Sequence, residues 1–258
     1  MLRPRVTPCL LLSEGGLVKT VGFASPKYVG DPINAVKIFN EKEADELIVL
    51  DIDATVKGRA PNERLIAQFA VECRMPLCYG GGITSVEQVK RIIGLGVEKI
   101  ALGASAIESP ELVESTAKEI GSQSVAVVID VRRGVGGAYE AFTRNGTKAT
   151  GLDPVAVARS VEARGAGEIV VNSIDRDGAM RGYDLELAAM IRAATRLPMT
   201  VLGGAGSLAD MQALFERCGV VGAAAGSLFV FKGTYKAVLI NYPGHAQKEA
   251  LIRAALPH

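Results

Sequence analysis

Histidine and tryptophan are scarce in this chain, which has two histidines and no tryptophan among its 258 residues. Both histidines, His245 and His258, lie near the C-terminus. A zinc site built on histidines, a Ser-His-Asp triad and a Cys-His pair each need an imidazole at the site. The composition therefore argues against these chemistries, and we expect neither a metal ion nor an organic cofactor.

Cysteines and long apolar runs are also few. The four cysteines (Cys9, Cys73, Cys78 and Cys218) fall in or beside apolar runs without metal-ligand spacing, which is typical of buried, reduced thiols. The first apolar run is broken by Pro8 and is too short for a signal peptide. No stretch approaches the ~20 apolar residues of a membrane span. We therefore expect a cytosolic protein that does not enter a membrane.

Charge of either sign is balanced, with 29 basic and 28 acidic residues and a formal net charge of +1. No broad field would draw such a chain to nucleic acid or to an anionic membrane. We expect no nucleic-acid partner, and any phosphate-binding site has to be local.

Short aliphatic runs alternate with longer segments of helical period, which predicts repeated βα units around a parallel sheet. The eight predicted strands are Arg5 to Leu12, Leu47 to Ile52, Leu77 to Tyr79, Lys99 to Leu102, Val125 to Val131, Ile169 to Asn172, Met199 to Leu202 and Val220 to Ala224. Eight such units predict one (β/α)₈ barrel with its site at the carboxyl ends of the strands. An open doubly wound sheet is the alternative.

The chain also contains an internal repeat. The segment EIVVNSIDRDGA from Glu168 resembles ELIVLDIDA from Glu46, about 122 residues upstream. Other matched pairs are Gly30-Asp31-Pro32 with Leu152-Asp153-Pro154, Gly80-Gly81-Gly82 with Gly203-Gly204-Ala205-Gly206, and Gly103-Ala104-Ser105 with Ala225-Gly226-Ser227. Two half-barrels, about 1–122 and 123–258 within a single domain, close naturally into a ring, which favours the barrel over the open sheet.

Several helix starts can be placed from the sequence. Pro32, Pro110 and Pro154 stand where a first helical residue is expected. Thr84, with a glutamate three residues later, resembles a capping box. The segment 233–243 is rich in β-branched and aromatic residues and does not suit a helix, whereas AQKEALIRAAL after it predicts the last barrel helix.

Glycine clusters follow two predicted strands, at 80–82 and 203–206, and each precedes a helix. Backbone N–H groups in such turns can approach an anion, which the dipole of the following helix also favours. A tight βα turn is the alternative explanation, but the recurrence in both halves favours phosphate binding. We expect a small molecule with phosphates at both ends, contacted by Gly81, Gly82, Ala104, Gly178, Gly204, Gly226 and Ser227.

Five aspartates stand at or just beyond strand ends, where a carboxylate can act as a general acid or base or can order a loop. We expect Asp53 and Asp175 to order loops, and Asp51 and Asp177 to contact ligand. Asp130 is the best candidate for chemistry, since it ends the apolar run AVVID.

Charged residues mark both ends of the predicted barrel. Lys19 lies in a long, glycine-bearing first loop that could be a mobile cover over a phosphorylated substrate, although a solvated surface lysine is the alternative. Arg5, Glu46, Lys99 and Glu168 each stand at the start of a strand and predict a charged ring that closes the bottom of the barrel. Structural salt bridging is the alternative explanation for this ring.

Six segments carry a resemblance to a known family: GDPINA at Gly30, DELIVLDI at Asp45, YGGGI at Tyr79, GSQSVAVVID at Gly121, RGAGEIVVNSIDRDG at Arg164 and GGAG at Gly203. Over almost its whole length the chain resembles the cyclase subunit of imidazole glycerol phosphate synthase. The resemblance implies a two-phosphate barrel that accepts ammonia from a glutaminase docked at its N-terminal face. In that family the ammonia passes along the barrel axis and enters an imidazole ring.

The resemblance also assigns roles to residues of this chain. Arg5, Glu46, Lys99 and Glu168 match the gate to the ammonia channel. Asp130 matches one of two catalytic aspartates, and Lys19 matches the loop lysine.

Four departures from the family pattern fall in the cyclase pocket. The other catalytic aspartate is replaced by Leu11, which cannot transfer a proton. The family's Asn-Thr beside one phosphate is Gly103-Ala104, and two hydroxyl side chains of its substrate channel appear as Asn172 and Leu202. The glutaminase face therefore matches the family better than the cyclase pocket does.

The segments CLLL, KYVGDPINA and SLFVFKGTYKAVLINYP resemble a branch of this family that is found with bacterial surface-polysaccharide genes. The resemblance implies work with a glutaminase and an asparagine-synthetase-like amidotransferase that turn an acetamido group of a sugar into an acetamidino group. The alternatives are a true cyclase of histidine biosynthesis with lyase chemistry, a non-catalytic scaffold that activates its partners, and an isomerase of the related phosphoribosyl barrels.

Overall fold

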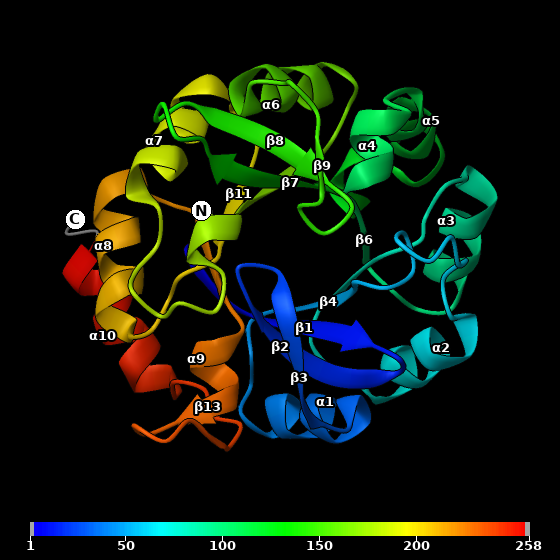
Figure 1. The fold of residues 1–258 in the computed structure, drawn as a ribbon. Helices are drawn as coiled ribbons and strands as arrows, with labels where there is room; N and C mark the ends of the chain where they lie inside the picture. Colours follow the sequence, from blue (N-terminus) through cyan, green and yellow to red (C-terminus); the bar gives the residue numbers. More distant parts are fainter. Residues whose placement is uncertain (1–2, 256–258) are drawn as a thin grey trace.

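Eight parallel strands close into a barrel in the computed structural model, which describes residues 3–255, so that His258 lies outside the described residues. Figure 1 looks along the barrel axis, with the strands inside and the helices outside. The barrel strands are β1 (Arg5–Ser13), β4 (Leu47–Asp51), β5 (Leu77–Gly80), β6 (Lys99–Leu102), β7 (Val125–Arg133), β10 (Glu168–Ser173), β11 (Met199–Leu202) and β12 (Gly222–Ala225). Pairing of β7 with β10 and of β12 with β1 closes the ring. The predicted (β/α)₈ barrel is confirmed, and the open sheet is excluded.

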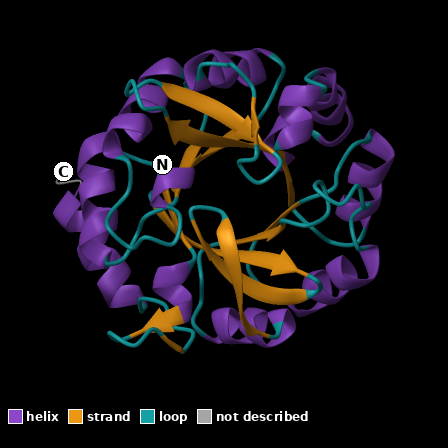
Figure 2. Ribbon diagram, viewed as in Figure 1, coloured by secondary structure: helices purple, strands orange, loops and turns teal. Residues whose placement is uncertain are grey.

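One long helix follows each barrel strand and covers its outer face (Figure 2). These helices are α1 (Pro32–Glu41), α2 (Glu63–Glu72), α3 (Val86–Gly94), α5 (Glu111–Ile120), α6 (Pro154–Ala163), α7 (Leu185–Ala194), α8 (Leu208–Cys218) and α10 (His245–Ala255). The last of them confirms the helix predicted after residue 243. None of the described helices is long and apolar enough to cross a membrane.

Two of the four helix starts predicted from the sequence are confirmed. Pro32 and Pro154 open α1 and α6, each behind an aspartate whose side chain accepts a backbone N–H. The capping box of α3 is built by Ser85 and Gln88, one residue later than predicted, because Ser85 is the residue with extended backbone angles. Pro110 is the N-cap of α5 and not its first residue.

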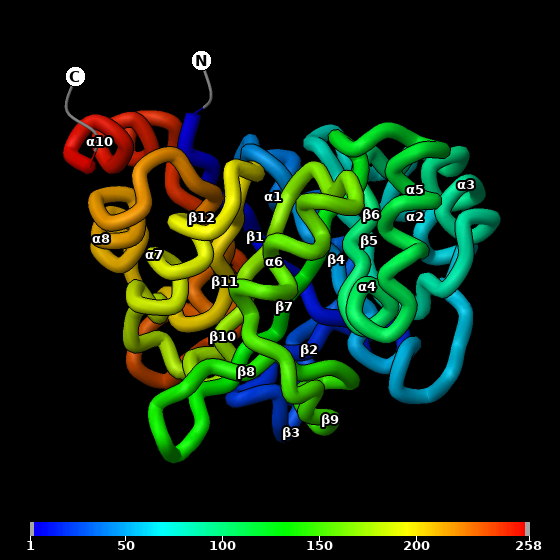
Figure 3. The backbone as a smooth tube through the Cα atoms, turned by 90° about the horizontal axis from the view of Figure 1, so that it is seen from above, coloured from blue at the N-terminus to red at the C-terminus, as the bar shows by residue number. Residues whose placement is uncertain are grey.

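Shorter elements extend from the carboxyl ends of the strands, and each one in the first half of the chain has a counterpart in the second half. Two hairpins follow barrel strands: β2 (Gly16–Val21) with β3 (Ala24–Gly30) after β1, and β8 (Tyr139–Thr143) with β9 (Lys148–Ala149) after β7. Short helices α4 (Ala104–Glu108) and α9 (Ser227–Val230) follow β6 and β12. Figure 3 shows the hairpins at the end of the barrel opposite to the termini. The first loop is therefore a two-stranded hairpin paired with β1, a structure that the glycine-rich sequence did not indicate.

Two separate apolar cores follow from the alternation of side chains along the barrel strands. The larger core packs the outer strand faces against the helices. The smaller core fills the inside of the barrel with side chains from all eight strands: Cys9, Ile48, Cys78, Ala101, Ala126, Val128, Val170, Leu202 and Ala224. Five of these nine are alanine or cysteine, so the interior is lined by smaller side chains than the Val, Ile and Leu usual in such barrels.

The segment between α9 and α10 forms a small hairpin, β13 (Phe231–Lys232) with β14 (Ala237–Val238), and then leads along the outside of the barrel to α10 (Figure 1). Tyr242 packs its ring against Phe39 and Phe229. Its hydroxyl donates to Val6 O at 2.8 Å. This contact ties the segment to the first strand and explains the presence of Tyr242, whereas Tyr235 is exposed.

Candidate functional site

A cavity opens at the carboxyl ends of the barrel strands and encloses about 1130 Å³ including its mouth. The predicted site residues that line it are Lys19, Asp51, Gly81, Ala104, Asp130, Asp177, Gly178, Gly204, Gly226 and Ser227. Residues from the start, middle and end of the chain thus meet in one place, at the end of the barrel expected for a site.

Asp130 ends the inward-facing row of β7 and reaches the floor of this cavity. Asn172 Nδ2, on the neighbouring strand β10, donates to Asp130 Oδ1 at 2.9 Å. Burial raises the pKa of Asp130 to about 7, with a smaller contribution from the nearby charge of Asp177, while the Asn172 hydrogen bond opposes the rise. A carboxyl group with a pKa close to neutrality can both take and give a proton under physiological conditions.

Asp177 is held by the hairpin that follows β1. Its Oδ2 accepts hydrogen bonds from Thr20 Oγ1 at 2.6 Å and from Phe23 N at 3.2 Å. Burial nevertheless raises its pKa. Asp177 therefore fixes the hairpin over the cavity while its side chain lines the cavity wall.

Asp51 accepts the N–H groups of Asp53 and Ala54, both at 3.0 Å, and lines the cavity as well. Burial raises its pKa despite these two hydrogen bonds. Asp53 accepts from Ser13 Oγ at 3.1 Å, from a backbone N–H and from a lysine, and orders the loops above β1 and β4. Asp175 likewise accepts Arg133 N at 2.8 Å, as expected for an aspartate that orders a loop.

Lys19 points into the barrel from β2 and is buried. Its Nζ donates to Cys9 O at 2.8 Å. A Cβ atom at Gly226 would lie 2.5 Å from this Nζ, so a larger residue there would displace the amine from its present position. Burial lowers the pKa of Lys19. Lys19 is therefore not a solvated surface lysine, and its amine stands beside one of the glycine turns.

The glycine turns have backbone angles that other residues rarely adopt. Gly81 and Gly204 have φ of 119° and 113°, and a Cβ at Gly204 would lie 2.2 Å from Gly182 O. Gly82 differs from the other predicted glycines, because it does not line the cavity and its N–H donates to Thr55 Oγ1 at 3.2 Å. The glycines at 81 and 204 thus bring the backbone to the cavity wall without a side chain.

Leu11, at the position where the family resemblance leads one to expect aspartate, also lines the cavity. Leu50 and Leu202 contribute to the same wall, and all three pack on the inner core. The floor beside Asp130 is therefore apolar on the side of β1, β4 and β11. The cavity has the half-buried carboxyl group of Asp130 on its floor and no second acid at position 11.

Two lining residues from the β8–β9 turn, Arg144 and Asn145, are not among the site residues that the sequence predicts. Asn145 Nδ2 donates to Ile52 O at 2.7 Å, across the mouth of the cavity. Arg144 pairs with Glu108 of α4 at 2.9 Å. The only available signal was their place in a loop after a barrel strand, and that place does not indicate which way a side chain points.

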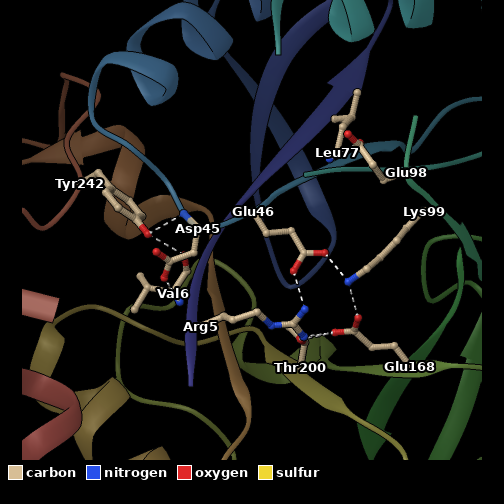
Figure 4. Close-up of polar contacts among 10 residues, drawn as sticks. All are labelled: Arg5, Val6, Asp45, Glu46, Leu77, Glu98, Lys99, Glu168, Thr200 and Tyr242. Atoms are coloured by element: carbon tan, nitrogen blue, oxygen red, sulfur yellow. Dashed lines mark hydrogen bonds and ion pairs between the residues drawn. The ribbon is translucent and has the colours of Figure 1, made fainter. Parts of the chain in front are cut away.

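The other end of the barrel carries the predicted ring of four charged residues, all pointing toward one another (Figure 4). Arg5 pairs with Glu46 at 2.9 Å and with Glu168 at 2.6 Å. Lys99 pairs with the same two glutamates, at 2.8 Å in each case. Thr200 Oγ1 donates to Glu168 Oε1 at 2.7 Å. Each acid thus contacts both bases, and the four side chains close the ring.

The pKa values in this ring depend on its pairing. Burial alone would lower the pKa of Arg5 and Lys99, but Glu168 and Glu46 reverse this and raise both. Burial would raise the pKa of Glu168, yet Arg5 and Lys99 together lower it. Arg5, Lys99 and Glu168 therefore keep their charges at neutral pH.

The described part of the chain contains no group of three or more His, Cys, Asp or Glu arranged to hold a metal ion. All four cysteines are free; Cys9 and Cys78 are buried inside the barrel, while Cys73 and Cys218 are half-buried. Burial raises the pKa of Cys9 to about 12, which makes it a poor nucleophile.

Comparison with known proteins agrees with this architecture. Residues 5–236 match the histidine biosynthesis protein family. The chain is 56% identical to the provisionally named imidazole glycerol phosphate synthase subunit HisF of Leptospira interrogans, over 97% of this chain and 99% of that protein. It is 52% identical to the provisionally named hisF2 subunit of Pseudomonas aeruginosa, over 94% and 97% of the two chains.

A relative without a provisional name is the imidazole glycerol phosphate synthase subunit HisF of Alkaliphilus metalliredigens. It is 39% identical over 89% of this chain and 91% of its own. With this identity over nearly the whole barrel, the chain belongs to the HisF family of imidazole glycerol phosphate synthase subunits.

Proposed function

We propose that this chain is the barrel subunit of a glutamine-dependent amidotransferase and conducts ammonia along its axis. A partner glutaminase would dock at the N-terminal face and release ammonia against the ring of Arg5, Glu46, Lys99 and Glu168. The ammonia would then reach Asp130 and a phosphorylated acceptor in the cavity. The observation that carries the proposal is the coaxial arrangement of the closed charged ring at one barrel end and the Asp130 cavity at the other.

Ring opening need not unfold the barrel, because the ring members lie at strand starts. Arg5 keeps 30% of its side-chain surface and Lys99 keeps 18%, whereas the two glutamates are nearly buried. The two bases are therefore the side chains that a docked partner could reach and draw away. The glutamates would stay with the barrel.

We further propose that the acceptor is an acetamido sugar and that its acetamido group becomes an acetamidino group. Loss of one of two catalytic carboxyl groups typically costs about 10²-fold or more in rate, so Leu11 disfavours the ring-forming reaction. The apolar wall of Leu11, Leu50 and Leu202 suits the methyl group of an acetamido substituent. The amide oxygen is a poor leaving group, which is the reason for a nucleotide-using, asparagine-synthetase-like partner that would activate it before ammonia displaces it.

Nitrogen tracing tests this proposal. The assay combines three proteins: the barrel, the glutaminase and the amidotransferase. The reagents are glutamine labelled with ¹⁵N at its amide, a nucleoside triphosphate, an acetamido sugar phosphate and an excess of unlabelled ammonium. We expect the ¹⁵N to appear in an amidino group of the sugar, identified by its ¹⁵N NMR signal. Equal dilution of the label by the added ammonium would contradict conduction through the barrel. Asp130→Asn tests the scaffold alternative, which requires unchanged product formation.

A true cyclase is the second candidate, favoured by the presence of Asp130, Asp177 and Lys19 together in the cavity. It predicts imidazole glycerol phosphate from the ribulosyl precursor with saturating ammonium and no partner. Leu11→Asp provides the matched variant: if only the missing carboxylate limits this reaction, the variant gains about 10²-fold in rate.

A further inference from the structure

Three buried side-chain atoms in the described residues have no hydrogen-bond partner: Thr7 Oγ1, Thr116 Oγ1 and Asn172 Oδ1. Folded proteins rarely leave such atoms unpaired, because burial strips them of water without compensation. Thr116 lies on the outer helix α5. The other two belong to barrel strands, and both face the inside of the barrel.

Thr7 faces inward by alternation, since its neighbours two residues away are Arg5 of the charged ring and Cys9 of the inner core. It is fully buried and lies beside Ala224 of β12. Its hydroxyl group therefore lies one layer above the charged ring, on the way toward the cavity.

Asn172 stands at the opposite end of the inner core, between Asp130 of β7 and Leu202 of β11. It is 5% exposed, and its Nδ2 is already engaged with Asp130 Oδ1. While Asp130 is ionised, that hydrogen bond fixes the amide orientation, because a carboxylate oxygen can only accept. The free Oδ1 then lies next to Gly203, a residue of the cavity wall.

Between these two oxygens the barrel interior is apolar and lined largely by small side chains. An ammonium ion would lose its hydration there without compensation, whereas neutral ammonia loses far less. Ammonia carries three N–H donors and one lone pair, so a lone buried acceptor is a suitable contact for it. The unpaired oxygens thus stand at the entrance and at the exit of a stretch that favours the neutral form.

We propose that Thr7 Oγ1 and Asn172 Oδ1 are two ammonia-binding stations, one at each end of the apolar interior. The proposal rests on the proposed function, in which ammonia travels along this axis. The Thr7 hydroxyl group can donate as well as accept, so ammonia leaves it in either direction. The Asn172 oxygen can only accept an N–H, which leaves the ammonia lone pair free to attack an acceptor beside Asp130.

Isosteric variants separate a transport role from a structural one. Thr7→Val removes the hydroxyl group at the same size, and Thr116→Val is the matched control, a buried unpaired hydroxyl group outside the barrel interior. Both variants should unfold at or above the wild-type temperature, since each loses an unsatisfied polar atom. Thr7→Ser keeps the hydroxyl group and serves as the second variant of this position.

The assay is the ¹⁵N-tracing reaction with an excess of unlabelled ammonium. We expect Thr7→Val to lower the labelled fraction of product about 5- to 10-fold, the effect of one lost hydrogen bond, with Thr116→Val and Thr7→Ser at the wild-type level. The rate of Thr7→Val with added ammonium and no glutamine should not change, because added ammonium enters at the cavity mouth. If the wild-type protein retains label and Thr7→Val retains as much as Thr116→Val, the station is refuted while conduction stands. If the wild-type protein retains none, the proposed function fails.

Asn172→Leu tests the second station. The rate with added ammonium should show a KM for ammonium raised about 5- to 10-fold, with the KM for the sugar unchanged. The pH profile should move to higher pH as well, because the variant removes the hydrogen bond that opposes the rise in the pKa of Asp130. A lower kcat and a shifted pH profile at an unchanged ammonium KM would instead make Asn172 only a positioning residue for Asp130, and would overturn the proposal for this residue.

Discussion

Replacing Asp130 by asparagine should stabilise the fold at neutral pH although it removes the candidate catalytic group. Burial raises the pKa of this carboxyl group from its ordinary 3.8 to about 7. Between these values the unfolded chain has lost the proton while the folded chain still holds it. The stability of the wild-type protein therefore falls as the pH rises from about 4 to about 7, and is constant above that range as far as Asp130 is concerned.

The magnitude follows from the two pKa values. At about 1.4 kcal/mol for each pKa unit, the ionised carboxylate costs the folded state about 4 kcal/mol. Water in the open cavity screens part of this cost, so we expect Asp130→Asn to gain about 2–4 kcal/mol at pH 8 and nothing at pH 4. The asparagine oxygen can still accept from Asn172. For a chain of this size the gain corresponds to a melting temperature about 4–12 °C higher.

Urea unfolding of both proteins between pH 4 and pH 8 measures this difference. Asp53→Asn is a matched control of opposite sign. Burial is the largest single effect and would raise the pKa of Asp53, but the hydrogen bonds from Lys57, Glu14 N and Ser13 together outweigh it and lower the pKa. The stabilising contribution of Asp53 is therefore present above pH 3.8 and is lost as the pH falls further. Asp53→Asn should therefore be less stable at pH 8. A pH-independent difference for Asp130→Asn, or a loss of stability at pH 8, would refute the argument.

Two further predictions concern the charged ring and a glycine turn. Lys99→Met leaves two nearly buried glutamates short of a partner and should lower the free energy of unfolding, measured in urea, by about 3–5 kcal/mol. The control Lys118→Met, in an exposed ion pair on a helix, should change it by less than about 0.5 kcal/mol. Equal effects would contradict a structural contribution of the ring. Gly204→Ala places a Cβ at 2.2 Å from Gly182 O and should unfold at a lower temperature than the wild-type protein. The control Gly94→Ala has free space around it near the end of a helix and should be neutral or stabilising. An unchanged unfolding temperature for Gly204→Ala would show that the turn can relax.

Sequence was sufficient for the fold because two independent signals agree. Alternating apolar runs located all eight barrel strands, and the repeat required both halves to share one architecture. Helix starts shifted by one residue where two candidate caps are adjacent: Thr84 and Ser85 both have hydroxyl groups, and only the backbone angles distinguish them. Local composition alone does not specify those angles.

The candidate site was only partly predictable. Side chains on the barrel strands, such as Asp130 and Lys99, could be placed because strand alternation determines where they point. Lys19 could not be placed from the sequence, because a glycine-rich stretch hides the hairpin that buries it. Asn145 could not be found at all, since its contact with Ile52 joins two loops that no local pattern relates.

The charged ring at the bottom of the barrel has alternating signs around the axis. In the order of the strands it reads Arg5, Glu46, Lys99 and Glu168, so its net charge is zero and it forms an electrostatic quadrupole. On the axis of an ideal quadrupole the potentials of the two signs cancel. If the ring is the entrance for ammonia, as in the proposed function, it would neither concentrate ammonium there nor repel it, and it would select among small molecules by closure alone. Removing either base would leave a net negative charge that attracts ammonium, the form that the apolar interior excludes.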